Sequence, residues 1–188
     1  MTDNSRNRII YISGGCRSGK SRYAEQRAET LTGKRSYIAT CPIIDAEMDG
    51  RIALHQQRRA GKGWLTVEEP LDLAQALMDT ADSAVVLVDC LTLWINNLLY
   101  EADCQDQTIS EVQITRCCQQ VIEACKAGDR TIIFVTNELG MGIVPADASS
   151  RRYRDLVGRC NQTLAGQADE VVFMVSGLPL FLKENSPS

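Results

Sequence analysis

The sequence lacks the features that mark several protein classes. It holds one histidine, and none of its eight cysteines forms a Cys-x-x-Cys pair, so the usual zinc sites are not expected. No apolar stretch approaches the roughly 18 residues that a membrane-spanning helix needs. The formal net charge is −4 and the basic residues are spread along the chain, which argues against a nucleic acid partner.

The N-terminus, the cysteines and the chain length indicate the cellular location and the number of domains. The N-terminus is polar and no apolar core follows it, so no secretory signal is visible. Unpaired cysteines then fit small hydrophobic side chains in a reducing compartment, and we expect a cytoplasmic protein. A length of 188 residues with 44% hydrophobic residues suits a single domain over 1–188. We expect residues 1–7 and 184–188 to be loose tails.

Strand-like and helix-like stretches alternate along the chain. Short apolar runs predict strands at 9–12, 36–40, 64–68, 84–88, 131–135 and 170–175. Helical spacing of apolar residues predicts helices at 22–28, 47–59, 71–78, 91–100, 109–127 and 149–168, with a polar connection at 101–108. This alternation predicts an α/β fold with a mostly parallel sheet and helices on both faces.

One glycine-rich stretch stands between the first strand and the first helix. It follows the pattern Gly, four residues, then Gly-Lys-Ser, which in this context indicates a phosphate-binding P-loop for a nucleoside triphosphate. Its backbone N–H groups and the helix N-terminus favour an anion. The lysine is expected to reach the β- and γ-phosphates, and the serine hydroxyl to bind Mg²⁺. The residues are Gly14, Gly15, Cys16, Arg17, Ser18, Gly19, Lys20 and Ser21.

Two carboxylates follow buried strands. Asp89 ends the run 84–88, where open α/β sheets bind ligands and where P-loop enzymes hold Mg²⁺. The alternative is that Asp89 caps the helix that starts near Leu91. Glu138 follows the run 131–135 at the same predicted edge, either as part of the site or as a solvated loop residue.

The single histidine lies on a polar helical stripe. Glu47, Arg51, His55 and Arg58 recur at helical spacing in the predicted helix 47–59. A neutral imidazole attacks phosphorus, and neighbouring arginines match phosphate oxygens, so His55 is a candidate carrier of a nucleotidyl group. The alternative is an ordinary solvated helix face.

Several motifs in order carry a family resemblance. They are the P-loop, Tyr37-Ile38-Ala39-Thr40, Arg51 to Arg59, Val88-Asp89-Cys90-Leu91-Thr92, Thr136-Asn137-Glu138 with Gly140 to Pro145, and Gly158-Arg159-Cys160-Asn161-Gln162. Over residues 8–183 the chain closely resembles the bifunctional adenosylcobinamide kinase/adenosylcobinamide-phosphate guanylyltransferases of cobalamin biosynthesis.

The resemblance implies a P-loop NTPase fold similar to the recombinase core, assembled as a homo-oligomer, with a homotrimer as the expected state. It implies phosphorylation of adenosylcobinamide by ATP or GTP, then transfer of GMP from GTP to adenosylcobinamide phosphate through a histidine–GMP intermediate on His55. It also implies nucleotide contacts, besides the P-loop, from Ile38, Ala39, Thr40, Gln56, Gln57, Arg58, Arg59, Glu68 and Asp89, with Glu69 as the alternative to Glu68.

Two other functions fit the residues alone. One is a plain P-loop kinase acting on a small alcohol or nucleotide, with His55 on the surface. The other is a nucleotide-dependent interaction module without group transfer. Labelling of the protein by GTP separates the first from guanylyl transfer, and turnover with cobinamide separates the second.

Overall fold

The computed structural model describes residues 7–41, 57 and 59–184. Its centre is one seven-stranded sheet with the strand order β3-β2-β4-β5-β1-β6-β7. All neighbouring strands pair in parallel except β6 and β7, which pair antiparallel. The strands are β1 (Arg8–Gly14), β2 (Arg35–Ala39), β3 (Trp64–Glu68), β4 (Val85–Asp89), β5 (Thr131–Val135), β6 (Glu170–Val175) and β7 (Leu178–Lys183).

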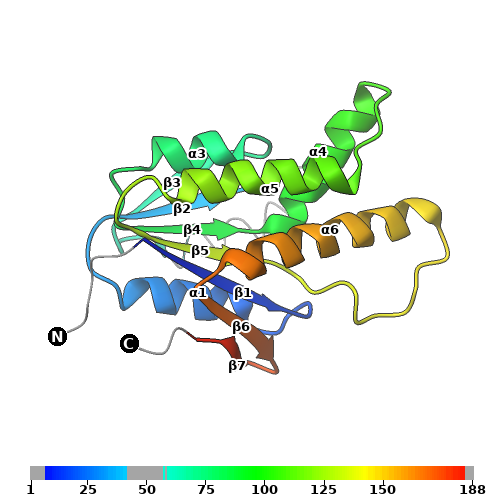
Figure 1. The fold of residues 1–188 in the computed structure, drawn as a ribbon. Helices are drawn as coiled ribbons and strands as arrows, with labels where there is room; N and C mark the ends of the chain where they lie inside the picture. The colour runs from blue at the N-terminus through cyan, green and yellow to red at the C-terminus, as the bar shows by residue number, and fades with distance from the viewer. Residues whose placement is uncertain (1–6, 42–56, 58, 185–188) are drawn as a thin grey trace.

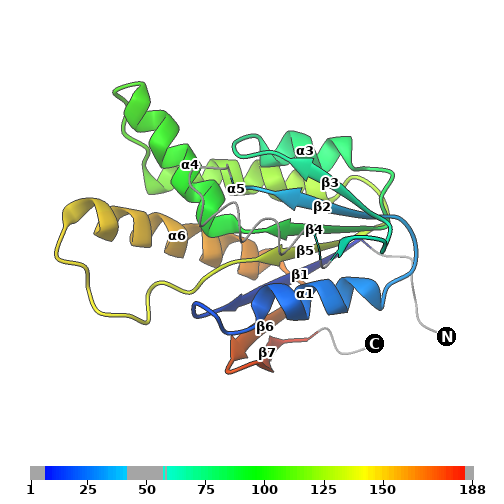
Figure 2. The same cartoon turned by 180° about the vertical axis from the view of Figure 1, so that it is seen from behind.

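Helices cover both faces of this sheet. Figure 1 shows α3, α4, α5 and α6 on one side and α1 on the other, and Figure 2 gives the reverse view. Alternate residues of β1 point to the two layers: Ile9 and Tyr11 pack in the α3–α6 core, and Ile10 and Ile12 in the α1 core. The helices are α1 (Lys20–Glu29), α3 (Leu73–Asp79), α4 (Leu91–Cys104), α5 (Glu111–Cys125) and α6 (Ala148–Gln167).

Local sequence explains where the longer helices begin. The hydroxyl of Ser110 accepts a hydrogen bond from the N–H of Gln113, whose side chain accepts one from the N–H of Ser110, which forms a capping box before α5. Asp147 accepts from the N–H of Ser150 and caps α6. In the sheet, Leu87 and Ile133 are fully buried, each contributing about 1.5–3 kcal/mol by removal from water.

The predicted fold is confirmed as a single domain with a mostly parallel sheet, and two predicted details are wrong. The connection expected at 101–108 is helical as far as Cys104, where the Gln105 side chain donates to Glu101 one turn earlier. Strand β7 was not expected. It follows β6 through a two-residue turn at Ser176 and Gly177, both with positive φ.

Two further expectations depend on residues beyond this description. Most of the predicted helix 47–59, including His55, lies outside the described residues, as do most of the two predicted tails. Within the described part of the chain, none of the helices combines the length and apolarity needed to cross a membrane.

Candidate nucleotide and phosphoryl-transfer site

The P-loop joins the carboxyl end of β1 to the start of α1. Gly14 has φ +149°, and a Cβ atom there would come within 2.5 Å of the Met174 carbonyl oxygen, so no side chain fits. Gly19, immediately before α1, has φ +92°. The sequence therefore places glycine at the two positions where the backbone must turn tightly before the helix N-terminus.

Lys20 lies inside this loop rather than in solvent. It is 8% exposed, and its ammonium donates to the Gly15 carbonyl oxygen at 2.6 Å and approaches the Ser18 hydroxyl at 3.5 Å. Burial lowers the pKa of Lys20 below its ordinary value, and the Cys90 thiol and the Asp89 carboxylate oppose this shift. An anion bound in the loop therefore forms an ion pair with Lys20, which offsets the cost of burying the charged ammonium.

Asp89 ends β4 at the same edge of the sheet. It lies opposite Ala39 of β2 and Val135 of β5. The Tyr37 hydroxyl donates a hydrogen bond to its Oδ2 at 3.2 Å, which orients the carboxylate. Helix α4 has Cys90 at its N-cap position, with no side-chain cap, so the alternative of Asp89 as a helix cap is wrong.

The backbone next to Asp89 is fixed by polar side chains. The Thr40 hydroxyl accepts from the Cys90 N–H at 2.9 Å and donates to the Cys90 carbonyl at 2.8 Å. The buried Asn97 side chain donates to the carbonyl oxygens of Thr40 and Pro70 at 2.7 and 3.0 Å. The chain after β2, the chain after β3 and the start of α4 are thus joined at this edge.

Arg59 adds a buried cation next to the same tyrosine. It is 5% exposed, its guanidinium carbon lies 3.4 Å from the centre of the Tyr37 ring, and its Nη1 lies 3.8 Å from Oε1 of Glu25 on α1. Trp64 meets the Tyr37 ring edge-on with centroids 6.3 Å apart. Tyr37 therefore contacts both Arg59, which follows the histidine segment in sequence, and the candidate magnesium ligand Asp89.

The chain was compared with known proteins. The family model "Cobinamide kinase / cobinamide phosphate guanyltransferase" matches residues 10–182. The chain belongs to this family. It is 43% identical to the bifunctional adenosylcobalamin biosynthesis protein CobP of Pseudomonas aeruginosa, over 92% of this chain and 95% of that protein. It is 40% identical to the corresponding protein CobU of Escherichia coli, over 93% and 99%.

A solved structure shows the same fold at low identity. The flagellar accessory protein FlaH of Methanocaldococcus jannaschii superposes with a TM-score of 0.55 and 14% identity, over 96% of this chain and 80% of that one. Family membership makes the chain a transferase of adenosylcobalamin biosynthesis, as the resemblance implied, and the chain shares its fold with FlaH.

The structure brings together only part of the residue set that the family resemblance implied. Gly14 to Ser21, the segment Ile38 to Thr40, and Asp89 lie at one edge of the sheet. Arg59 is buried beside them, whereas Gln57 is exposed. His55, Gln56 and Arg58 lie outside the described residues.

The two glutamates left open by the sequence are in different surroundings. Glu68 ends β3 opposite Ala39 and is exposed. The Glu69 carboxylate accepts hydrogen bonds from the N–H groups of Leu71 and Asp72 at 2.8 and 2.9 Å. Glu69 thus has a local structural role before α3, which favours Glu68 as the candidate nucleotide contact.

Tyr37 is the site residue to which sequence reasoning gave no role. It stands two positions before Ala39 in β2, so both side chains point to the same face of the sheet. That spacing was the only available signal, and the contact with Asp89 becomes visible only with the register of β2 against β4.

Proposed function

We propose that this chain phosphorylates the hydroxyl of adenosylcobinamide with ATP or GTP, and then transfers GMP from GTP to adenosylcobinamide phosphate through a covalent intermediate on His55. The observation that carries the proposal is the meeting of the buried Lys20 and the oriented Asp89 at one sheet edge, in a chain of the cobinamide kinase/guanyltransferase family.

For the kinase step, Lys20 neutralises charge on the β- and γ-phosphates while the loop N–H groups hold the nucleotide. Ser21 and Asp89 supply oxygen ligands of the kind that Mg²⁺ prefers, and the hydrogen bond from Tyr37 fixes the Asp89 carboxylate for that role. Bound Mg²⁺ supplies further charge neutralisation on the phosphates. The substrate hydroxyl oxygen forms a bond to the γ-phosphorus, the bond from that phosphorus to the β–γ bridging oxygen breaks, nucleoside diphosphate leaves, and the hydroxyl proton passes to solvent.

For the transferase step, an imidazole nitrogen of His55 attacks the α-phosphorus of GTP and pyrophosphate leaves. A phosphate oxygen of adenosylcobinamide phosphate then attacks the same phosphorus, the bond from nitrogen to phosphorus breaks, and adenosylcobinamide-GDP forms. Since attack is in line, His55 approaches from the side of the nucleoside, opposite the pyrophosphate. Either GTP lies differently in the two half-reactions or the predicted helix 47–59 moves between them.

The nucleotide contacts proposed for both steps come from the family resemblance. Arg59 is 5% exposed, and its Nε and Nη1 have no hydrogen-bond partner among the described residues, which leaves both N–H groups available to an anion. The other proposed contacts are Gly14 to Ser21, Ile38, Ala39, Thr40, Gln56, Gln57, Arg58, Glu68 and Asp89.

A homotrimeric assembly and a cytoplasmic location remain predictions.

The deciding experiment is labelling of the protein with GTP in the presence of Mg²⁺. We expect the intact protein mass to rise by one guanylate, with a bond that is labile to acid and stable to alkali. His55→Ala should abolish this label and GMP transfer while keeping part of the kinase activity, because transfer of the γ-phosphoryl group needs no imidazole. Lys20→Ala should weaken triphosphate binding and impair both steps.

Each outcome separates the candidate functions. A His55→Ala variant that still transfers GMP overturns the assignment of the nucleophile. Phosphorylation of adenosylcobinamide without any protein label reduces the chain to a plain kinase. Nucleotide binding with no turnover of cobinamide contradicts both reactions.

A further inference from the structure

A concave site lies beside the P-loop on the other face of the sheet from α1. It is a cleft of about 530 Å³ between α6 and the strands β1, β6 and β7, called the α6 cleft below. Its wall includes Ser13, which directly precedes Gly14 of the P-loop, and Glu138, whose N–H donates to the Gly14 carbonyl oxygen at 3.1 Å. The α6 cleft therefore adjoins the loop that holds the triphosphate.

Both arginines of the α6 cleft are paired with carboxylates. The Arg159 guanidinium donates to Glu111 at 2.6 and 2.8 Å, and Arg154 donates to Asp155 at 3.0 and 3.2 Å. The Glu138 carboxylate accepts from the Gly140 N–H at 2.8 Å. Because each arginine has its own carboxylate and the lining carries three carboxylates to two guanidinium groups, the cleft does not favour a phosphate, and it suits a polar ligand without negative charge.

A buried hydroxyl lines the same cleft. Tyr11 is 2% exposed and lines the α6 cleft, and its oxygen makes no hydrogen bond of good geometry among the described residues, with Thr136 as its polar side-chain neighbour. Burial raises the pKa of Tyr11 far above its ordinary value, so the hydroxyl stays neutral and is both donor and acceptor. A buried hydroxyl of this kind is satisfied by a ligand group that both donates and accepts, such as a carboxamide.

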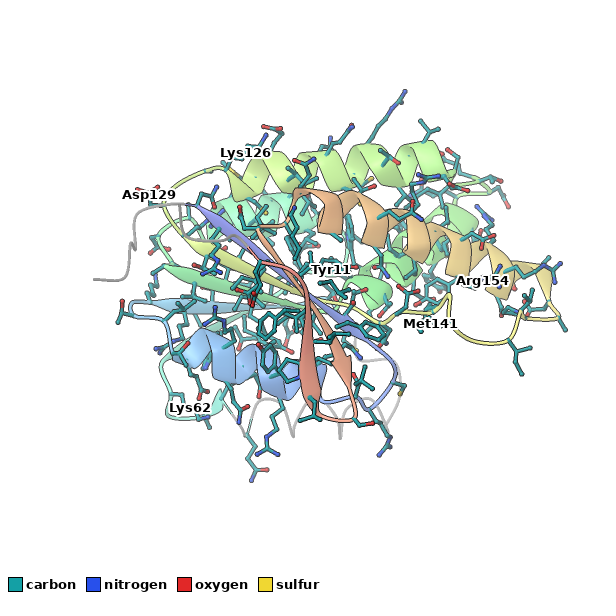
Figure 3. The ribbon with its side chains drawn as sticks, turned by 60° about the horizontal axis from the view of Figure 1, so that its bottom comes forward. Tyr11, Lys62, Lys126, Asp129, Met141 and Arg154 are labelled. Atoms are coloured by element: carbon teal, nitrogen blue, oxygen red, sulfur yellow. The ribbon has the colours of Figure 1, made fainter. Side chains whose placement is uncertain are left out.

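An apolar loop borders the cleft. Met141, Ile143 and Val144 follow the cleft residue Gly140 and are 76%, 97% and 63% exposed. Figure 3 shows Tyr11 on the sheet, Arg154 on α6, and Met141 on the connection that leads to this helix. An apolar surface next to a polar cleft whose arginines are already paired matches a large ring that carries several amide arms.

We propose that the α6 cleft binds the carboxamide arms of the corrinoid, with the hydroxyl of Tyr11 as one hydrogen-bonding partner. This inference rests on the proposed function, because it names the site for that substrate. It places the corrinoid beside the P-loop, on the α6 side of the sheet, while the nucleotide occupies the loop itself.

The proposal is tested by a substitution that adds a side chain at a glycine in the wall of the α6 cleft. A Cβ atom placed on Gly158 of α6, which lines the cleft, meets no heavy atom of the described residues within 4 Å outside its own helix, so a side chain can begin there, and Gly158→Leu adds apolar volume at the cleft wall. Gly166 of the same helix is equally unobstructed, is exposed, and does not line the cleft, which makes Gly166→Leu the matched control. Both changes replace a helical glycine with a better helix former.

The measured quantities are the KM for adenosylcobinamide in the kinase reaction and the Kd for GTP. We expect Gly158→Leu to raise this KM by roughly tenfold or more with the Kd for GTP within about twofold, and Gly166→Leu to change neither. Tyr11→Phe, which removes only the hydroxyl, should raise the KM by roughly three- to tenfold, as the loss of one hydrogen bond does.

Failure of this inference and failure of the proposed function give different experimental results. If the parent protein phosphorylates adenosylcobinamide and both Gly158→Leu and Tyr11→Phe keep its KM, the α6 cleft does not hold the corrinoid. If Gly158→Leu changes the mass of the assembly in sedimentation and leaves the KM unchanged, the cleft is a contact between copies of the chain, and the inference is wrong. If the parent protein phosphorylates no adenosylcobinamide, the proposed function itself fails.

Discussion

The fully buried thiol of Cys125 predicts a loss of stability at alkaline pH. Cys125 ends α5 and is 0% exposed, and burial raises its pKa from 9.0 to about 12, with the nearby Arg130 guanidinium opposing the shift. In the unfolded chain this thiol ionises near its ordinary pKa. Between these two values the unfolded chain loses a proton that the folded chain keeps, so stability falls as pH rises, and below the lower value the thiol contributes no pH dependence.

The size of the effect follows from the same two values. At about pH 10.5 the thiol is ionised in the unfolded chain and protonated in the folded one. This pH lies roughly 1.5 units above the pKa of the thiol in the unfolded chain, so the unfolding free energy falls by about 2 kcal/mol. That is a large part of the 5–15 kcal/mol typical of a folded domain. The expected loss is therefore well within the reach of an equilibrium measurement.

The assay compares urea unfolding at about pH 7.5 and about pH 10.5, in the presence of a thiol reductant. Cys125→Ala creates the same cavity at both pH values, so only the pH-dependent difference is informative. We expect the unfolding free energy of this variant to fall by about 2 kcal/mol less than that of the parent protein between these conditions. An equal pH response of Cys125→Ala and the parent refutes the reasoning.

Two further substitutions test the edge of the sheet. Tyr37→Phe keeps the ring under Arg59 and removes the hydrogen bond to Asp89. It should lower the free energy of urea unfolding by about 1 kcal/mol and raise the Mg²⁺ concentration needed for half-maximal kinase activity by roughly threefold or more. An unchanged Mg²⁺ dependence contradicts a positioning role for Tyr37. Asn97→Leu should lower the free energy of unfolding by about 2–3 kcal/mol, because it leaves two carbonyl oxygens unsatisfied. Asn96→Leu, at the exposed neighbouring position, should change that free energy little. Equal losses in the two variants contradict a structural role for the Asn97 hydrogen bonds.

The features that could be predicted from the sequence are those encoded within a few neighbouring residues. The P-loop is readable because its glycines, lysine and serine are adjacent in the chain. Strands β4 and β5 are readable because burial on both faces requires an unbroken apolar run. Strand β7 gave no such signal, since its side chains are exposed and Pro179 lies within it, as edge strands allow.

The parts that could not be predicted depend on contacts between distant segments. The hydrogen bond from Tyr37 to Asp89 requires β2 and β4 to pair with Ala39 opposite Asp89. The α6 cleft joins Tyr11 of β1 to residues of α6 more than a hundred positions later, and no local pattern relates them. Such combinations follow from the crossover connections of a parallel sheet, which bring elements together irrespective of their separation along the chain.

The contrast in charge between the two sites bears on how one chain serves two reactions. The P-loop presents backbone N–H groups and Lys20 to an anion, whereas the arginines of the α6 cleft are neutralised by Glu111 and Asp155. The amide arms are the same in adenosylcobinamide and in its phosphate, so a site that recognises the arms holds substrate and product of the kinase step equally well. It follows that Gly158→Leu should raise the KM for both compounds by the same factor, while a cleft that held the new phosphate would affect the phosphorylated compound alone. Under the proposed function, equal effects mean that the corrinoid keeps its place while the nucleotide chemistry changes from the γ- to the α-phosphorus.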